Sequence, residues 1–121
     1  MKVWKDGDKR GITPPNHFGG LEVLDIVPFG GGAFSVQVSK APSGGGGEMH
    51  HHEDWSQVFY VVDGELTFDT GQDRFTLTKG QAVLFEPGDP HYTLNESEAE
   101  STCLVITFDN SKLASQAQGA A

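Results

Sequence analysis

Basic residues are scarce in this sequence. Its 121 residues include 8 Lys and Arg against 17 Asp and Glu, which gives a formal net charge of −9. Proteins that bind nucleic acid use clusters of Lys and Arg to displace counterions from the phosphates. The composition therefore argues against nucleic acid as a partner.

Cysteine is nearly absent as well. The single Cys103 cannot form an intramolecular disulfide, and it lies in the apolar run Cys103-Leu104-Val105-Ile106. A cysteine in such a run is expected to be a small buried hydrophobic residue rather than a nucleophile. The lone cysteine and the lack of an apolar segment near Met1 predict a cytoplasmic location. No apolar run approaches the length of a membrane span, so we expect no membrane partner.

Helical periodicity is missing from all but the polar tail, residues 111–121. Instead, 16 glycines and 6 prolines separate short apolar runs rich in Val, Phe, Thr and Tyr. Such runs predict β-strands. The predicted strands cover residues 21–28, 34–39, 58–62, 66–69, 75–77, 82–85, 91–94 and 102–108. Many short strands at even spacing predict a single all-β domain, a sandwich or a barrel, over residues 1–121.

The connections between these strands also have recognisable composition. Asp63-Gly64 predicts a tight hairpin turn. Residues 42–47 contain four consecutive glycines and are expected to form a flexible loop. Residues 1–20 are expected to form an N-terminal arm, and residues 111–121 a loose tail.

Histidines are few but closely grouped, in the run His50-His51-His52. Residues two apart on an extended strand point to the same face, so His50 and His52 would present both imidazoles to one side. His51 would face outward. Gln57 and His91 could complete a set of four ligands around one divalent metal.

Two longer patterns extend this histidine group. They are Gly44-x5-His50-x-His52-x4-Gln57-x6-Gly64 and Gly80-x5-Glu86-Pro87-Gly88-x2-His91-x3-Asn95. They resemble the two signature motifs of the cupin superfamily over residues 44–64 and 80–95. The resemblance implies a double-stranded β-helix, or jelly-roll barrel, with one divalent metal (Zn, Mn, Ni or Fe) inside it. It also implies that His50, His52 and His91 are ligands, and that the protein is a homodimer.

Gln57 stands where the family pattern has a glutamate, and Glu86 where it has a proline. An amide oxygen can bind hard cations, although Gln57 could also merely pack near a metal held by three histidines. Three histidines carry no ligand charge, with or without Gln57 as a fourth ligand. A neutral ligand set favours Lewis-acid chemistry over oxygen activation. Cupins with a His-His-Gln-His set, such as sugar-acid ketonising enzymes, are similar, and polyketide-cyclase cupins are a related comparison.

Several other residues bear on the pocket of such a barrel. Phe59, Phe85 and Phe108 are expected to line its interior, where core and pocket wall overlap. Glu48 is expected on the rim. His17 lies in a proline-rich N-terminal segment and is expected to be structural rather than catalytic. No Ser–His–Asp or Cys–His arrangement points to a nucleophile, so the catalytic residue remains unassigned.

Three functions are compatible with these patterns. The first is a metal-dependent isomerase, cyclase or lyase that acts on a small oxygenated organic substrate. The second is an Fe(II)-dependent dioxygenase. The third is a cupin that binds a small molecule, or a structural metal, without catalysis.

Overall fold

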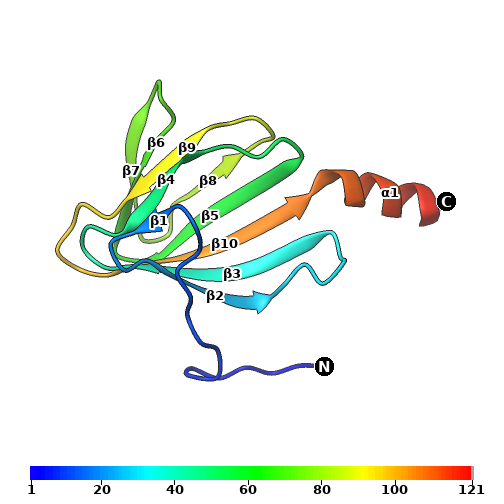
Figure 1. Ribbon diagram of the computed structural model, residues 1–121, viewed down its shortest axis with the longest axis horizontal. Helices are drawn as coiled ribbons and strands as arrows, with labels where there is room; N and C mark the ends of the chain where they lie inside the picture. The colour runs from blue at the N-terminus through cyan, green and yellow to red at the C-terminus, as the bar shows by residue number, and fades with distance from the viewer. Residues whose placement is uncertain (121) are drawn as a thin grey trace.

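The chain folds into ten strands and a C-terminal helix, according to a computed structural model that describes residues 1–120 (Figure 1). The strands are β1 (His17–Phe18), β2 (Glu22–Val27), β3 (Phe34–Ala41), β4 (Gly46–His50), β5 (Trp55–Asp63), β6 (Glu65–Asp69), β7 (Arg74–Thr78), β8 (Ala82–Phe85), β9 (His91–Leu94) and β10 (Ser101–Asp109), and the helix is α1 (Asn110–Ala120).

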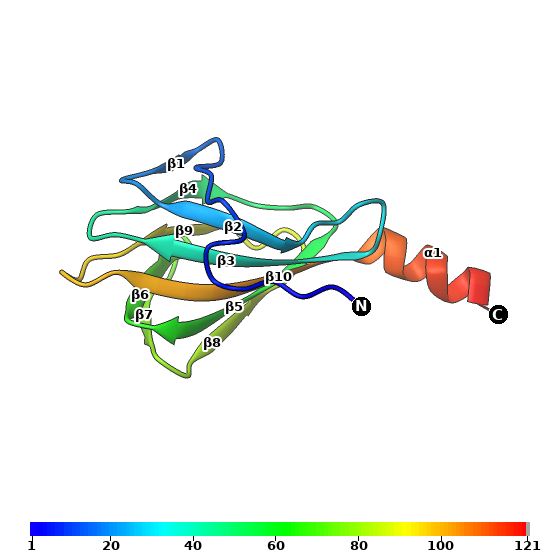
Figure 2. The same ribbon diagram turned by 90° about the horizontal axis from the view of Figure 1, so that it is seen from below.

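The strands form two five-stranded antiparallel sheets. Sheet I has the order β2-β3-β10-β5-β8, and sheet II has the order β1-β4-β9-β6-β7. The two sheets face each other and enclose the interior, and α1 extends beyond one end of the barrel (Figure 2). The all-β jelly-roll barrel predicted from the sequence is confirmed.

Strand β10 shows how the sequence forms this interior. Ser101, Cys103, Val105 and Thr107 are buried and alternate with partly exposed residues, as the two-residue period of a strand requires. Cys103 is 1% exposed, as predicted, and burial raises its pKa to about 11. The apolar core consists of Leu21, Val23, Ala41, Val61, Leu66, Phe68, Phe85, Cys103 and Val105.

The glycine-rich segment at residues 42–47 corrects one prediction, because its second half is an ordered strand. Gly46 and Gly47 are buried and begin β4. A Cβ atom at Gly46 would collide with the backbone carbonyl of Thr93, and one at Gly47 would lie 3.0 Å from the ring of His17. These glycines allow the neighbouring strands of the sheet to approach closely, and they do not make the segment flexible.

Asp63-Gly64 corrects a second prediction. Gly64 has the positive φ of 75° that a tight turn uses. However, β5 pairs with β8 and β10, whereas β6 pairs with β7 and β9. The turn therefore carries the chain from sheet I to sheet II and does not close a hairpin.

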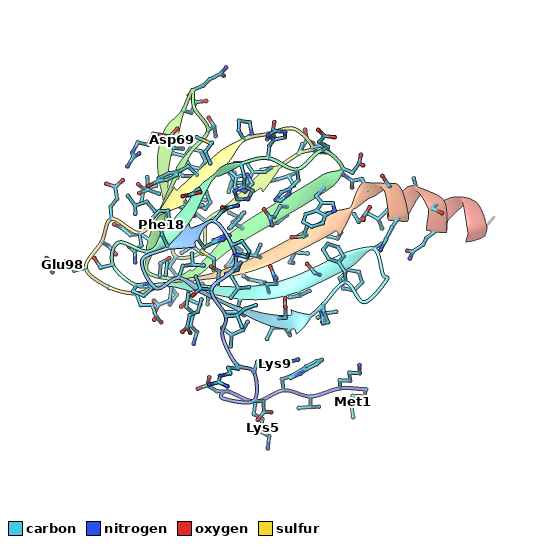
Figure 3. The ribbon with its side chains drawn as sticks, viewed as in Figure 1. Met1, Lys5, Lys9, Phe18, Asp69 and Glu98 are labelled. Carbon is cyan, nitrogen blue, oxygen red and sulfur yellow. The ribbon has the colours of Figure 1, made fainter. Side chains whose placement is uncertain are left out.

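The two ends of the chain differ from each other. The tail predicted to be loose is helical over Asn110–Ala120, and Asp109 Oδ1 accepts a hydrogen bond from the Lys112 N–H as an N-cap. The N-terminal segment with Met1, Lys5 and Lys9 lies apart from the barrel (Figure 3). Among the described residues, no helix is long and apolar enough to cross a membrane.

The outer face of sheet I is apolar. Two rows of side chains cross it in register: Leu24, Val38, Leu104 and Tyr60 form one, and Val36, Ile106, Val58 and Leu84 form the other. Each of these residues alternates along its own strand with a residue whose side chain faces the interior of the barrel. Phe108 belongs to this outer face, because it follows the buried Thr107 on β10. The expectation that Phe108 lines the interior is therefore corrected.

Candidate metal centre

Three histidines meet inside the barrel. His50 is the last residue of β4, and it pairs in register with His91, the first residue of β9. His52 follows β4 by two residues. One ring nitrogen from each of the three lies within 4.8 Å of the others. The ring centroids of His50 and His91 are 4.4 Å apart, and those of His50 and His52 are 5.0 Å apart.

The backbone around His52 explains how a residue beyond the strand reaches this point. The prediction placed His50 and His52 on one continuous strand, but β4 ends at His50. The carbonyl of His52 accepts a hydrogen bond of 2.7 Å from the N–H of Gly88. Gly88 lies in the turn over residues 86–89, where its φ of 86° suits glycine. The two histidine motifs are thus tied together by backbone.

A backbone contact also orients His50. Its Nδ1 lies 2.7 Å from the carbonyl oxygen of Glu48. A carbonyl oxygen only accepts, so Nδ1 carries the hydrogen and Nε2 keeps its lone pair. Glu48 itself is exposed and contributes this carbonyl, not its carboxylate. His51 is exposed, as expected from its position between two inward histidines.

His91 is the most deeply buried of the three, at 1% exposure. Phe85 stacks on its ring with centroids 4.4 Å apart, and neither ring nitrogen has a hydrogen-bond partner. Burial, with a smaller effect of His50, lowers the pKa of His91 to about 4. Burial also lowers the pKa of His52, and the nearby imidazoles of His50 and His51 lower it further. A lowered pKa favours the neutral ring, which is the form that binds metals.

Gln57 presents a further atom without a partner. Its Nε2 donates a hydrogen bond of 2.9 Å to Thr107 Oγ1, the residue opposite it on β10. Its Oε1 is buried and has no partner among the described residues. A buried acceptor without a partner costs about 1–3 kcal/mol. The free nitrogens of His91 and the free oxygen of Gln57 are ligand types that divalent metals accept.

These residues lie at a cavity of about 420 Å³ that both sheets enclose. His50, His52, Gln57 and His91 all line it. Trp55 lines it too, with its ring 4.7 Å from that of His52 and 5.1 Å from that of Phe29. Among the described residues that line the cavity, none is Lys or Arg.

The three phenylalanines predicted for the pocket have different positions. Phe59 lines the cavity. Phe85 is buried behind His91 and packs against Phe59, with ring centroids 5.9 Å apart, so it supports the site from the core. Phe108 lies on the outer face of sheet I.

His17 lies closer to the site than the sequence suggested. Its ring lines the cavity, with its centroid 6.2 Å from that of His50. The backbone before it is strained, since Asn16 has a φ of 62°. His17 Nδ1 lies 2.9 Å from the carbonyl of Pro15, so this nitrogen carries the hydrogen. Its position on β1, beside Gly47, is compatible with contact to a bound molecule.

Asp25 and Gln37 were not singled out from the sequence, although both line the cavity. Gln37 Nε2 donates a hydrogen bond of 2.6 Å to Asp25 Oδ1. They lie on β2 and β3, far along the chain from the histidine motifs. Asp25 has the same parity as Val23 on a predicted strand, but apolar residues occupy both faces of that strand, so alternation could not place it.

Two five-stranded sheets form a jelly-roll barrel, and three histidines converge inside it on a potential metal site. The family model of the cupin domain matches residues 37–107, more than half of the chain. The chain belongs to the cupin family. A comparison with curated protein sequences found no match.

Solved structures share the fold at low sequence identity. The polyketide cyclase RemF from Streptomyces resistomycificus is 18% identical, with a TM-score of 0.79 over 89% of this chain and 79% of that one. A predicted oxalate decarboxylase from Thermotoga maritima is 18% identical, with a TM-score of 0.78 over 88% and 98%. A sugar phosphate isomerase from Silicibacter pomeroyi is 22% identical, with a TM-score of 0.69 over 83% and 69%. Similarity at this level establishes the fold alone.

Proposed function

We propose that this cupin is a metal-dependent enzyme of isomerase, cyclase or lyase type, and that its substrate is a small oxygenated organic molecule. The observation that carries the proposal is the set of unpartnered acceptors at the cavity. Both ring nitrogens of His91 and Oε1 of Gln57 are buried and without hydrogen bonds. In the neutral ring of His91 one nitrogen carries the hydrogen, so His91 offers one lone pair and Gln57 offers its oxygen. A metal ion would satisfy atoms of this kind, which otherwise destabilise the fold.

His50, His52 and His91 would hold the ion, and Gln57 Oε1 would be the fourth ligand. When bound, a divalent ion supplies Lewis acidity that polarises an oxygen atom of the substrate. The chain supplies the surroundings. Phe59 and Trp55 form an apolar wall, which would exclude water and orient an apolar part of the substrate.

The neutral ligand set favours this class over the dioxygenase. Three imidazoles and an amide bring no negative charge, so the full charge of the ion acts on the substrate. The structural neighbours include a polyketide cyclase, a predicted oxalate decarboxylase and a sugar phosphate isomerase. This range of reactions supports the broad class and leaves the particular reaction open.

The test begins with protein expressed without a histidine tag and stripped of metal. Calorimetric titration with Zn, Mn, Ni and Fe(II) should give one site per chain in the wild type. Exchange of carbon-bound hydrogen in D₂O, followed by NMR over a panel of hydroxy-ketones and phenols, then reports Lewis-acid enolisation. Absence of metal binding would refute the proposal, and Fe(II)-dependent oxygen consumption would favour the dioxygenase instead.

We also propose that the protein pairs with a second copy through the outer face of sheet I. Leu84 is 54% exposed and Tyr60 43% exposed, and both belong to the two apolar rows on this face. A contiguous apolar surface of this kind marks an interaction site on most proteins. The N-terminal segment also stands apart from its own barrel (Figures 1 and 3). It is therefore free to contact a neighbouring copy.

A further inference from the structure

The cavity has a second polar group, contributed by strands other than those that carry the histidines. Asp25 on β2 is the one carboxylate among the described residues that line the cavity. Its Oδ1 accepts the hydrogen bond from Gln37 Nε2 on β3, at 2.6 Å. Among the described residues, Gln37 is its one hydrogen-bond partner, and no Lys or Arg forms an ion pair with it.

A half-buried carboxylate with a single neutral donor can accept further hydrogen bonds. Two carboxylate oxygens offer about four acceptor positions, of which Gln37 fills one. The donors that could fill the others are hydroxyl, N–H or ammonium groups. Because no Lys or Arg lines the cavity, the chain itself supplies no cation for this end of it.

The rest of the cavity narrows the choice of ligand. The rings of Phe29 and Trp55 lie 5.1 Å apart and form an apolar wall. An anionic group placed beside Asp25 would meet its carboxylate with no Lys or Arg of the cavity wall to compensate the charge. A cationic ligand would be disfavoured at the histidine cluster when a divalent ion is bound there. An uncharged molecule with a hydroxyl group and an apolar ring fits all three conditions.

We propose that Asp25 accepts a hydrogen bond from a hydroxyl group of the substrate, and that Gln37 is a positioning residue which orients the carboxylate. The group that meets Asp25 is therefore an uncharged hydroxyl on a molecule with a ring, such as a phenol or an enol, and not a phosphate or a carboxylate. This inference rests on the proposed function in placing a small molecule in the same cavity and, for the exclusion of a cationic ligand, a divalent ion at the histidines.

The test uses four ring probes that differ in one substituent at the same position: naphthol, methoxynaphthalene, naphthoate and naphthylmethylamine. Dissociation constants are measured by fluorescence on the metal-free protein and on the zinc-loaded protein. Hydrogen bonds to charged groups contribute about 1.5–3 kcal/mol, which corresponds to roughly tenfold or more in affinity. The metal-free wild type should therefore bind naphthol at least about tenfold more tightly than methoxynaphthalene or naphthoate.

The informative variant is Asp25→Asn, which keeps an oxygen for the Gln37 N–H and removes the charge. It should lose most of the preference for naphthol and gain affinity for naphthoate. A gain of this kind does not follow from misfolding. The control is Glu22→Gln, which removes an exposed carboxylate from the same strand and should leave all four affinities unchanged.

The outcomes separate this inference from the proposed function. Unchanged probe affinities in Asp25→Asn would overturn the role of Asp25, and a preference of the zinc-loaded wild type for naphthylmethylamine would overturn the choice of an uncharged hydroxyl group. Failure of zinc to bind would overturn the metal-dependent function. The probe preferences of the metal-free protein would in that case still decide the role of Asp25.

Discussion

Gln57 and Thr107 face each other across β5 and β10, and the amide nitrogen of Gln57 lies 2.9 Å from the hydroxyl oxygen of Thr107. This hydrogen bond decides which end of the amide faces away from Thr107. Without it, Gln57 could turn its N–H group toward a metal, which an N–H group cannot bind.

Thr107→Val should therefore weaken metal binding while the ligands remain in place. Loss of a partner that orients a ligand typically costs about 10–100-fold in metal affinity. Calorimetric titration with zinc measures the change. Thr107→Ser keeps the hydroxyl and should bind zinc as the wild type does. Equal affinities for all three proteins would show that the Thr107 hydroxyl does not orient a metal ligand.

Replacement of His50, His52 or His91 by Ala should each reduce metal affinity by at least about a hundredfold, because a ligand atom is lost. The matched control is His51→Ala, which removes an exposed imidazole from the same run. Metal content after dialysis provides the measurement. If a single replacement leaves the metal content unchanged, that histidine is not a ligand.

Gln57→Glu should bind divalent metal at least as tightly as the wild type, because a carboxylate adds Coulomb attraction. The added charge should also raise the pKa of a metal-bound water and lower turnover. The pKa of the metal-bound water and the turnover rate are measured on the same metal-loaded preparation. A gain of oxygen consumption would favour the dioxygenase. If both Gln57→Glu and Gln57→Ala behave as the wild type does, Gln57 has no part in the site.

The metal-free protein should lose stability as the pH falls from 6.5 toward 4. The pKa of His91 is about 4 in the folded chain against an ordinary 6.5. In this window the unfolded chain binds a proton that the folded chain does not, so acid favours unfolding, by up to about 3 kcal/mol. Urea denaturation at several pH values measures it. His91→Gln should flatten this part of the profile relative to the wild type, and identical profiles would contradict the assignment.

The wild type should be a dimer at micromolar concentration, and Leu84→Glu should be a monomer, since it places a charge on the proposed interface. Leu84 is already half-exposed, so the barrel itself should tolerate the change. Light scattering after gel filtration gives both masses. Met49→Glu, at a similarly exposed apolar residue of sheet II, should remain dimeric. A monomeric wild type would end this proposal.

The strands and the histidines could be predicted because each depends on local pattern. Alternation and turn residues marked most of the strands, and the spacing of His50, His52 and His91 placed them in a recognisable pair of motifs. The turn at residues 86–89 was also readable, because glycine and proline have strong local preferences.

The errors have physical causes that no local pattern contains. Four consecutive glycines are compatible with a flexible loop and equally with a strand that packs tightly on its neighbour, and the contact with Thr93 decides between them. Sheet I has apolar residues on both faces, so alternation could assign neither Phe108 to the outside nor Asp25 to the inside. The position of His17 depends on β1 pairing with β4, a contact between segments that are separated in the chain by β2 and β3.

Gly46 has a consequence for any comparison of variants. Because a side chain there would strike the backbone of Thr93, a saturation library should recover glycine alone at this position, as strictly as it recovers the histidines. The pairing of β4 with β9 sets His50 opposite His91, so the hydrogen atom of Gly46 protects the ligand geometry from within the sheet. Invariance of this glycine across related sequences would thus reflect the lack of space between β4 and β9. The residue itself would touch neither metal nor substrate.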